Sequence, residues 1–471
     1  MTRERDVAFD LAENITRLNY EDIPAGDRLL AKMNIIDTLA CTLTGPRDRV
    51  CRAVVDIMLK QGGREESTVV GYGYRLPAAP AALLNALMAR AFDFDDCHEG
   101  TACHCSVSTV PVALAMAERQ GRLSGRDIIA SVVLANDLIA RLALAANTGL
   151  GPGNRVFATS MLYGTFGAAA AAGKMLGLDC DQMVNALGIA MTRTGGTMQY
   201  VKDDGAYHIN FGMLAQVGVM AALMAQRGIM FARNVFEGVY GLFQAYKGGD
   251  YRPEELTADL GKRFEGSGIS IKPYPCCKHS HTSVTAVLEA MVRFNLKPDD
   301  IEEMVIRGNQ SVMEMSRDRE NIRFDPDNRL EARAGVEKLA GIAVVKGSIT
   351  IEDMLGETFK DEKVFSRIAG VARRVRVELD PELNATYSGG KVSPSILHIR
   401  TRDGRSLTHR VDYVKGHPRN PMSLDDVIEK FRTCAPSALK KLSPEGLDEV
   451  TGLLRNLDEV GNVSRIIELI S

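Results

Sequence analysis

The sequence lacks the features that mark several classes of protein. Lysine and arginine together number 57 and aspartate and glutamate 60, so the formal net charge of -3 gives no basic surface for a nucleic acid or an anionic membrane. The N-terminal segment, MTRERDVAFDLAENI, has charges of both signs and no apolar signal core. The longest apolar runs, such as residues 128–135, are too short to cross a bilayer. We therefore expect a soluble, cytoplasmic protein with no nucleic-acid or membrane partner.

Nucleotide-binding and disulfide signatures are also missing. The glycine cluster that begins at Gly149 does not follow a predicted strand and lacks the spacing of a dinucleotide-binding or phosphate-binding loop. Nine cysteines, an odd number, in a long chain without a signal peptide argue against a disulfide framework. These absences leave a globular chain of 471 residues, long enough for roughly two or three domains.

Hydrophobic spacing divides the chain into parts of different character. Up to about residue 260, apolar residues recur at intervals of three and four, which is typical of packed helices. Beyond residue 262, β-branched alternation predicts strands in four segments, and helical spacing returns after the N-cap residue Ser423. The predicted strand segments are 301–308, 371–379, 395–401 and 407–414, with helical stretches at 331–346 and 355–368. We therefore predict a mainly α protein, in which residues 1–265 and 413–471 form a large all-helical domain and residues 266–412 a smaller inserted α+β domain.

Cysteine and histidine are concentrated in two short windows, the first of which directly follows an apolar helix. This window, residues 92–111, contains Asp93, Asp95, Asp96, Cys97, His98, Cys103, His104 and Cys105. A carboxylate such as Asp93 can orient an imidazole such as His104 and raise its basicity, which gives a general base near neutral pH. The alternative is a helix C-terminal loop with capping carboxylates. The density of titratable groups favours the catalytic interpretation.

The second window, residues 271–291, combines prolines, cysteines and histidines before a predicted helix. The prolines keep the chain extended until the helix begins near His281, whose imidazole pKa the helix dipole would lower. Anions bind readily at such a helix N-terminus, and Lys272 and Lys278 add charge that suits a substrate carboxylate. The alternative interpretation is a capped linker between domains.

Together the two windows could supply a zinc ion with cysteine and histidine ligands. The candidate ligands are His98, Cys103, His104, Cys105, Cys276, Cys277, His279 and His281. Their spacings match no established zinc arrangement, and the adjacent Cys276 and Cys277 suit a tetrahedral site poorly. We therefore predict neither a metal nor a cofactor.

A third polar region, residues 192–216, is rich in glycine and precedes another predicted helix. Four of its side chains could face a pocket: Tyr200, Lys202, Tyr207 and His208.

At these motifs the sequence resembles the MmgE/PrpD family, which includes 2-methylcitrate dehydratase, cis-aconitate decarboxylase and iminodisuccinate epimerase. The matching segments run in order through nearly the whole chain. They are residues 91–96 with His104 and Ser106, 125–130, 164–179, 212–218, 272–277 with His281, 331–333, and 416–423. The resemblance implies a helical domain with an inserted α+β lid, a homodimer, and an active site between the domains that needs no cofactor or metal.

The resemblance also implies roles for individual residues. Asp93, His104 and His281 occupy catalytic positions, and Cys97 stands where a threonine is common. Two positions depart from the family pattern. Ala158 replaces a frequent histidine, and Tyr207 replaces a frequent lysine, for which Lys202 or His208 could substitute.

These residues lead to a functional hypothesis, namely a lyase that acts on a small di- or tricarboxylate by proton transfer next to a carboxylate. His104, oriented by Asp93, is the predicted base or acid, His281 the second proton-transfer group, and Tyr207 a donor. The predicted substrate-binding residues are Cys97, His98, Lys202, His208 and Lys272. An epimerase or isomerase of a dicarboxylate such as iminodisuccinate is the first alternative. A non-catalytic binding protein of the same family and a zinc hydrolase are the others.

Overall fold

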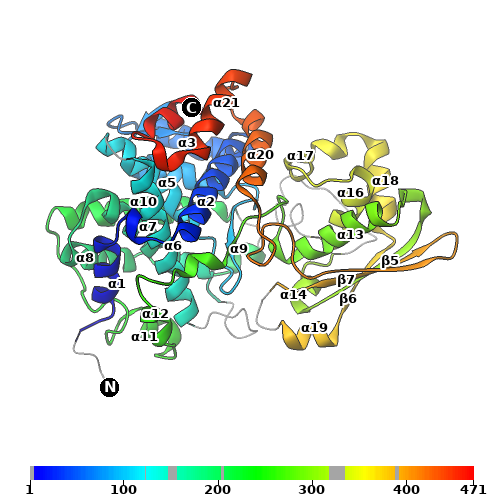
Figure 1. Cartoon of the computed structure of the whole chain (residues 1–471), viewed down its shortest axis with the longest axis horizontal. Helices are drawn as coiled ribbons and strands as arrows, with labels where there is room; N and C mark the ends of the chain where they lie inside the picture. Colours follow the sequence, from blue (N-terminus) through cyan, green and yellow to red (C-terminus); the bar gives the residue numbers. More distant parts are fainter. Residues whose placement is uncertain (1–4, 122–123, 147–155, 203–205, 318–334, 388–391) are drawn as a thin grey trace.

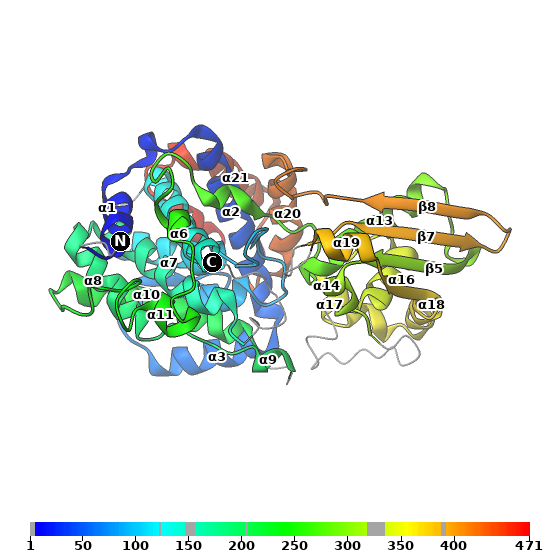
Figure 2. The same cartoon turned by 90° about the horizontal axis from the view of Figure 1, so that it is seen from below.

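The chain folds into two lobes that lie side by side, a larger helical lobe and a smaller lobe built on a four-stranded sheet (Figures 1 and 2). The computed structural model describes residues 5–121, 124–146, 156–202, 206–317, 335–387 and 392–471, without the side chains of residues 201 and 202. Helices far outnumber strands in these ranges, so the predicted mainly α fold class is confirmed.

The larger lobe contains helices from both ends of the chain. Its helices are α1 (Ala8–Arg17), α2 (Ala25–Thr44), α3 (Arg49–Gln61), α4 (Ala78–Ala89), α5 (Ser106–Gln120), α6 (Gly125–Ala145), α7 (Thr159–Leu176), α8 (Cys180–Met191), α9 (Gln199–Lys202), α10 (His208–Gln226), α11 (Leu242–Lys247), α12 (Glu254–Thr257), α20 (Leu424–Cys434), α21 (Pro444–Arg455) and α22 (Ser464–Leu469). The C-terminal α20 packs against the N-terminal α2 (Figure 1). As predicted, Ser423 caps α20, because its side chain accepts a hydrogen bond from the Asp426 backbone N–H.

Small residues bring the central helices of this lobe close together. α7 packs against α6 and α10, and its alanine run is completely buried. A Cβ atom at Gly218 of α10 would lie only 2.3 Å from the Cβ of Ala168 in α7. The glycine is therefore needed for the close approach of the two backbones.

The smaller lobe has helices against its sheet. The strand order is β6 (Val375–Leu379), β5 (Ile301–Gly308), β7 (Ser395–Thr401) and β8 (Ser406–Val411), and only the β5–β6 pair is parallel. Register pairs Met304 of β5 with Val375 of β6 and with Ile399 of β7. The helices are α13 (His281–Arg293), α14 (Gln310–Met313), α16 (Val336–Lys346), α17 (Ile351–Met354), α18 (Glu362–Ala372) and α19 (Pro381–Thr386), and α13 and α16 contact the strands.

One strand boundary in this lobe differs from the sequence prediction. The segment expected as a strand from Val371 begins as the last turn of α18, and β6 starts only at Val375. The apolar residues Ile368, Val371 and Ala372 lie on the buried face of the helix, so helical spacing continues further than the β-branched alternation suggests.

Short strand pairs complete the larger lobe and its junction with the smaller one. β1 (Ser67–Val69) pairs with β2 (Tyr74–Leu76), and β3 (Cys97–His98) pairs with β4 (Ile269–Ser270). The second pair joins the first cysteine- and histidine-rich window to the chain just before the second. The two windows are therefore neighbours in space as well as in composition.

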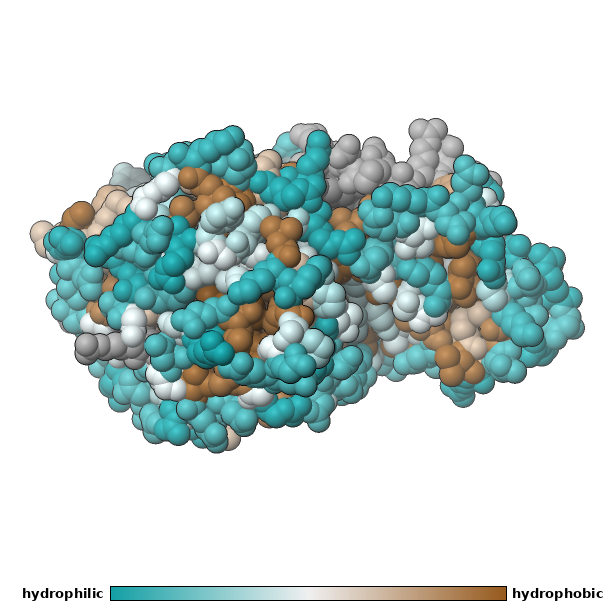
Figure 3. All heavy atoms as spheres, turned by 90° about the horizontal axis from the view of Figure 1, so that it is seen from above, coloured by the Kyte–Doolittle hydropathy of each residue, from teal (hydrophilic) through white to brown (hydrophobic). Residues whose placement is uncertain are grey.

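The surface and the apolar helices show which faces are covered. Seen from the face opposite to Figure 2, the protein is mainly hydrophilic, with hydrophobic patches on both lobes (Figure 3). Among the described residues, α6 and α10 are long and apolar enough to cross a membrane, so the expectation that no run reaches that length is wrong. The apolar window of α6 is 94% buried inside the protein, and that of α10 is 56% buried. Packing inside the fold therefore explains why α6 is so apolar.

Candidate active site

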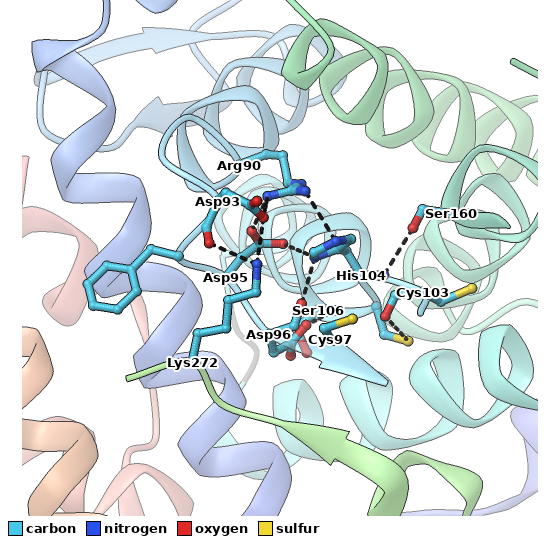
Figure 4. Close-up of polar contacts among 12 residues, drawn as sticks. Arg90, Asp93, Asp95, Asp96, Cys97, Cys103, His104, Ser106, Ser160 and Lys272 are labelled. Atoms are coloured by element: carbon cyan, nitrogen blue, oxygen red, sulfur yellow. Dashed lines mark hydrogen bonds and ion pairs between the residues drawn. The ribbon is translucent and has the colours of Figure 1, made fainter. Parts of the chain in front are cut away.

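The first window forms a tight loop between α4 and α5. Arg90 caps the C-terminus of α4, where a positive charge is favourable, and α5 begins at Ser106. Asp93 has a left-handed backbone with φ 54°, a conformation that aspartate tolerates better than most residues. Arg90, Asp93 and Asp95 lie next to one another at this turn (Figure 4).

Arg90 and Lys272 neutralise two carboxylates at the centre of this loop. The Nη1 group of Arg90 donates to Asp93 and, over 2.8 Å, to Oδ1 of Asp95, and Lys272 forms an ion pair with Asp93 (Figure 4). Burial alone raises the pKa of Asp95, but Arg90 and His104 outweigh it and hold that pKa at about 2. Burial likewise lowers the pKa of Lys272, and Asp93 more than reverses that shift. All four groups are therefore charged at neutral pH.

His104 lies against this network as a neutral imidazole. Its Nδ1 lies 2.8 Å from the Asp96 carbonyl oxygen and 2.9 Å from Oδ2 of Asp95, so Nδ1 carries the proton. Its Nε2 therefore has the lone pair and accepts from Nη2 of Arg90 over 3.1 Å. Burial, followed by the charge of Arg90, lowers the pKa of His104, and Asp95 partly compensates. His104 is thus an unprotonated base whose lone pair is held by an arginine.

This arrangement corrects the predicted partner of His104. Asp93 was expected to orient the imidazole, but the carboxylate at the Nδ1 atom is that of Asp95. The left-handed turn at Asp93 points its side chain to Arg90 and Lys272 instead.

The neighbouring Asp96 differs from Asp95 in its charge state. Its Oδ1 accepts from the Ser106 backbone N–H over 3.2 Å, and its completely buried side chain has no cationic partner among the described residues. Burial, reinforced by neighbouring carboxylates, raises the pKa of Asp96 to about 7. The carboxyl group of Asp96 therefore gains and loses its proton within the physiological pH range.

Lys272 does not act as the free carboxylate anchor that the sequence suggested. It is almost completely buried, and its ammonium group donates to the backbone oxygen as well as the carboxylate of Asp93. Lys430 of α20 also contacts both windows. It pairs with buried Asp37 and donates to the carbonyl oxygens of Phe94 and Lys272 over 2.8 and 2.9 Å. The C-terminal helix therefore fixes both windows.

His281 is the first residue of α13, as predicted, and it is completely buried. Its Nε2 donates to the carbonyl oxygen of Cys276 over 3.1 Å, so Nδ1 has the lone pair and meets no hydrogen-bond partner among the described residues. Burial, followed by the charges of Lys272 and Lys278, lowers the pKa of His281 well below its usual value. This is a second neutral imidazole near the Arg90 network, and its basic nitrogen is unoccupied.

Tyr207 borders the network, whereas His208 does not. The guanidinium of Arg90 lies 4.8 Å above the ring of Tyr207, which stacks on Tyr200 at 5.9 Å. His208 begins α10 and turns away, completely buried, with Nε2 3.4 Å from Asp48. Tyr207 is the N-cap residue of α10, and its ring meets that of His208 edge-on at 5.8 Å, so the two side chains are in contact although only Tyr207 lies against Arg90. The side chain of Lys202 lies outside the described residues.

The side chains of His98 and Cys97 are both held inside the fold. His98 donates from Nε2 to the Glu265 carbonyl oxygen over 3.0 Å and accepts at Nδ1 from the Gly100 N–H, so both ring nitrogens are engaged by the backbone. The expected substrate contact of His98 stays a prediction. Cys97 is buried in β3, and burial raises the pKa of its thiol to about 12.

Ala158, where the sequence resemblance suggested a histidine, lies at the start of the helix that contacts His104. It is the N-cap residue of α7, and Ser160, two residues further on, accepts from the His104 backbone N–H over 3.0 Å.

Potential metal ligands do not gather as the zinc alternative requires. In the part of the chain that the structure describes, two groups of three residues place ligand atoms within 4.8 Å, namely Asp93–Asp95–His104 and Asp48–Cys51–His208. In the first group the carboxylates already bind Arg90 and Lys272, and in the second Asp48 caps α3. The cysteines of the two windows belong to neither group.

Two central residues, Arg90 and Asp95, were not singled out from the sequence. A signal for Arg90 exists, because an arginine that ends an otherwise apolar helix three and five residues before two aspartates is a natural partner for both. Asp95 could not be distinguished from Asp93 or Asp96, since that choice depends on the turn at Asp93.

Comparison with known families agrees with this site. The model of the MmgE/PrpD N-terminal domain matches residues 9–254, and that of the MmgE/PrpD C-terminal domain matches residues 274–448. The chain belongs to the MmgE/PrpD family. Both windows fall within the matched regions, except for the first residues of the second one.

Similar proteins in this family include lyases of two kinds. The cis-aconitate decarboxylase of Aspergillus terreus is 27% identical over 99% of this chain and 96% of its own length. That of Homo sapiens is 27% identical over 94% of this chain and 90% of its own length. The 2-methylcitrate dehydratase of Escherichia coli (strain K12) is 22% identical, covering 88% of this chain and 87% of its own length.

Proposed function

We propose that this protein is a lyase that removes carbon dioxide or water from a small di- or tricarboxylate by proton transfer at the carbon next to a carboxylate. The observation that carries the proposal is the pair of neutral, buried imidazoles, His104 and His281, beside the charged network of Arg90. Similarity to decarboxylases and dehydratases over nearly the whole chain supports it. Because the decarboxylases are the more similar group, cis-aconitate is the first substrate to test.

Dehydration needs one group that takes a proton and one that gives it, whereas decarboxylation needs a group that gives a proton. In decarboxylation the C–C bond to the leaving carboxylate breaks, and its electron pair ends as a new C–H bond made with a proton from an acid. In dehydration a base removes the proton beside a carboxylate while an acid protonates the departing hydroxyl group. His104 through Nε2 and His281 through Nδ1 are the two proposed proton-transfer atoms. Both pKa values are low in the free protein, and a bound polycarboxylate would raise them toward neutrality.

Asp95 and Asp93 have different proposed roles. Asp95, in contact with Nδ1, stabilises His104 when it becomes protonated, and Asp93 keeps Arg90 and Lys272 in place. Tyr207 is a proposed donor at the edge of the site, below Arg90. Side chains alone supply the proton transfers in this scheme, so independence from metals and cofactors is part of the proposal.

Three further expectations belong to this proposal. Residues 266–412 would act as a lid over the helical domain of residues 1–265 and 413–471, which is supported by the position of His281 at the start of the smaller lobe. A homodimer is supported by the exposed methionines on one face of α10, Met213, Met220 and Met224. The cytoplasmic location stays a prediction.

A substrate panel in the presence and absence of a chelator tests the proposal. Purified protein is incubated with cis-aconitate, 2-methylcitrate and iminodisuccinate, and release of carbon dioxide, change in ultraviolet absorbance and NMR spectra are followed. Carbon dioxide release or loss of water that survives the chelator supports the lyase. Inversion at a carbon without net release would identify an isomerase instead. No reaction with any compound would favour the non-catalytic binding protein.

A further inference from the structure

Arg90 has hydrogen-bond donors that the protein itself does not use. An arginine side chain has five N–H bonds. Nη1 donates to Asp93 and Asp95, and one N–H of Nη2 points to His104. Nε is buried and has no hydrogen-bond partner among the described residues. A buried, unpartnered N–H of a charged group is unfavourable, so its presence here indicates an acceptor from outside the protein.

The unused donors lie on one edge of the guanidinium. Nε and Nη2 share the side of the planar group away from Nη1, and this edge matches the two oxygens of a carboxylate. The rings of Tyr207 and Phe211 lie 4.8 and 5.2 Å from the guanidinium carbon, and the ring of Phe211 also meets His104 edge-on. Aromatic walls exclude water, which strengthens an ion pair formed there.

Charge does not oppose an anion at this edge. The negative charges of Asp93 and Asp95 are balanced by Arg90 and Lys272, and His104 is neutral. The side chains of His104 and Arg90 are 14% and 7% exposed, and Nη2 of Arg90 lies 3.1 Å from Nε2 of His104. An acceptor reaching Nε and Nη2 would thus lie next to Nε2 of His104.

We propose that Arg90, through Nε–H and the second N–H of Nη2, binds one carboxylate of the substrate beside His104. This inference rests on the proposed function and names the residue that recognises the reacting end of the substrate. A carboxylate there competes for Nη2 and weakens the hydrogen bond that holds the lone pair of His104. Its negative charge also raises the pKa of His104. Substrate binding therefore prepares the base, and a molecule without the carboxylate leaves the lone pair occupied.

Equilibrium binding tests the assignment without relying on turnover. Isothermal titration calorimetry is performed with tricarballylate, an unreactive tricarboxylate, and with glutarate and methylsuccinate, which each lack one of its carboxylates. Arg90→Met removes the donors, Arg90→Lys keeps a point charge, and Arg119→Met serves as a control because it removes an arginine from the separate ion pair with Glu66. Circular dichroism establishes that each variant is folded.

The expected result is a specific coupling between Arg90 and one carboxylate. Loss of a charge-assisted, bidentate contact should weaken tricarballylate binding about 10- to 100-fold in Arg90→Met. The affinity should fall less in Arg90→Lys and stay unchanged in Arg119→Met. One of the two dicarboxylates should lose almost no further affinity in Arg90→Met, because its contact with Arg90 is already missing. Equal loss for all three ligands, or no loss, would overturn the assignment. If the unaltered protein binds none of the three, the proposed function itself fails. If Arg90→Met does not fold, the same comparison is made with Arg90→Lys.

Discussion

Replacement of Asp95 by asparagine separates the two carboxylates that the sequence could not distinguish. The side chain is completely buried, its Oδ1 accepts from Arg90 over 2.8 Å, and its Oδ2 lies 2.9 Å from Nδ1 of His104. Asparagine keeps the shape and removes the charge. The backbone oxygen of Asp96 still holds the Nδ1 proton, so the imidazole keeps its orientation. The change therefore tests the electrostatic contribution of Asp95 to a protonated His104.

The expected size follows from the short distance. Two unit charges about 3 Å apart interact by about 5 kcal/mol at an effective dielectric constant of about 20. Each charge is spread over several atoms, and we expect about half of this to be lost. That corresponds to about a 100-fold lower kcat/KM, together with a lower pKa of His104.

Steady-state kinetics over a range of pH is the assay, with cis-aconitate or whichever panel compound reacts. Where His104 takes a proton, as in dehydration, activity requires its unprotonated form and falls at acidic pH. Where it gives a proton, as in decarboxylation, activity requires its protonated form and falls at alkaline pH. In either case this limb of the pH profile should move to lower pH in Asp95→Asn, because the charge that raises the pKa of His104 is gone. Asp93→Asn is the matched control. It leaves Lys272 without its carboxylate and should lower thermal stability, but it keeps Asp95 beside His104 and this limb in place. A fully active Asp95→Asn with an unchanged limb would refute the assigned role.

Three further predictions concern the interior that supports the site. Lys430→Met leaves buried Asp37 unpaired and should lower the free energy of unfolding in urea by about 3–5 kcal/mol. Adding Asp37→Asn to the same chain should restore part of this loss. If the single and the double variant are equally stable, the pairing is contradicted. Asp96→Asn should stabilise the protein more at pH 8 than at pH 5. The folded-state pKa of Asp96, near 7, lies above the unfolded-state pKa, so the unaltered protein loses stability as the pH rises from the unfolded-state pKa through 7. Melting curves that show the same gain at both pH values would count against this prediction. Gly218→Ala should cost at least about 1–3 kcal/mol, because its Cβ would clash with the Ala168 side chain and with backbone atoms of Ala168 and Ala169, so Ala168→Gly should restore only part of the stability; an unchanged melting temperature would exclude the close contact.

The fold class was predictable because long amphipathic periodicity identifies helices well. Residues 125–145 are helical from end to end, and the start of α13 at His281 and the cap at Ser423 also agree with the prediction. The end of α18 was missed because β-branched residues serve both in strands and on a buried helix face. Sequence spacing alone does not decide between the two.

The site was predictable in its location but not in its contacts. The two windows are neighbours in the structure. As the charged residues around it in the sequence suggested, His104 contacts a charged network, through Arg90 and Asp95. Which carboxylate reaches it depends on the left-handed turn at Asp93, a tertiary feature without a clear sequence mark. His98 and His208, which were predicted as substrate contacts, contact backbone or carboxylate groups of the protein itself, because a histidine in a polar stretch serves equally well to satisfy such buried groups.

The most direct test of the proposed proton transfer is turnover of cis-aconitate in deuterated water, followed by NMR, with the unaltered protein and with His104→Gln and His281→Gln. We predict loss of carbon dioxide together with one deuterium placed next to a carboxylate in the product. The reaction should be unaffected by a chelator and slowed at least about 100-fold in each histidine variant. Turnover that persists at the original rate in both variants, or that requires an added metal, would contradict an active site built on these two imidazoles.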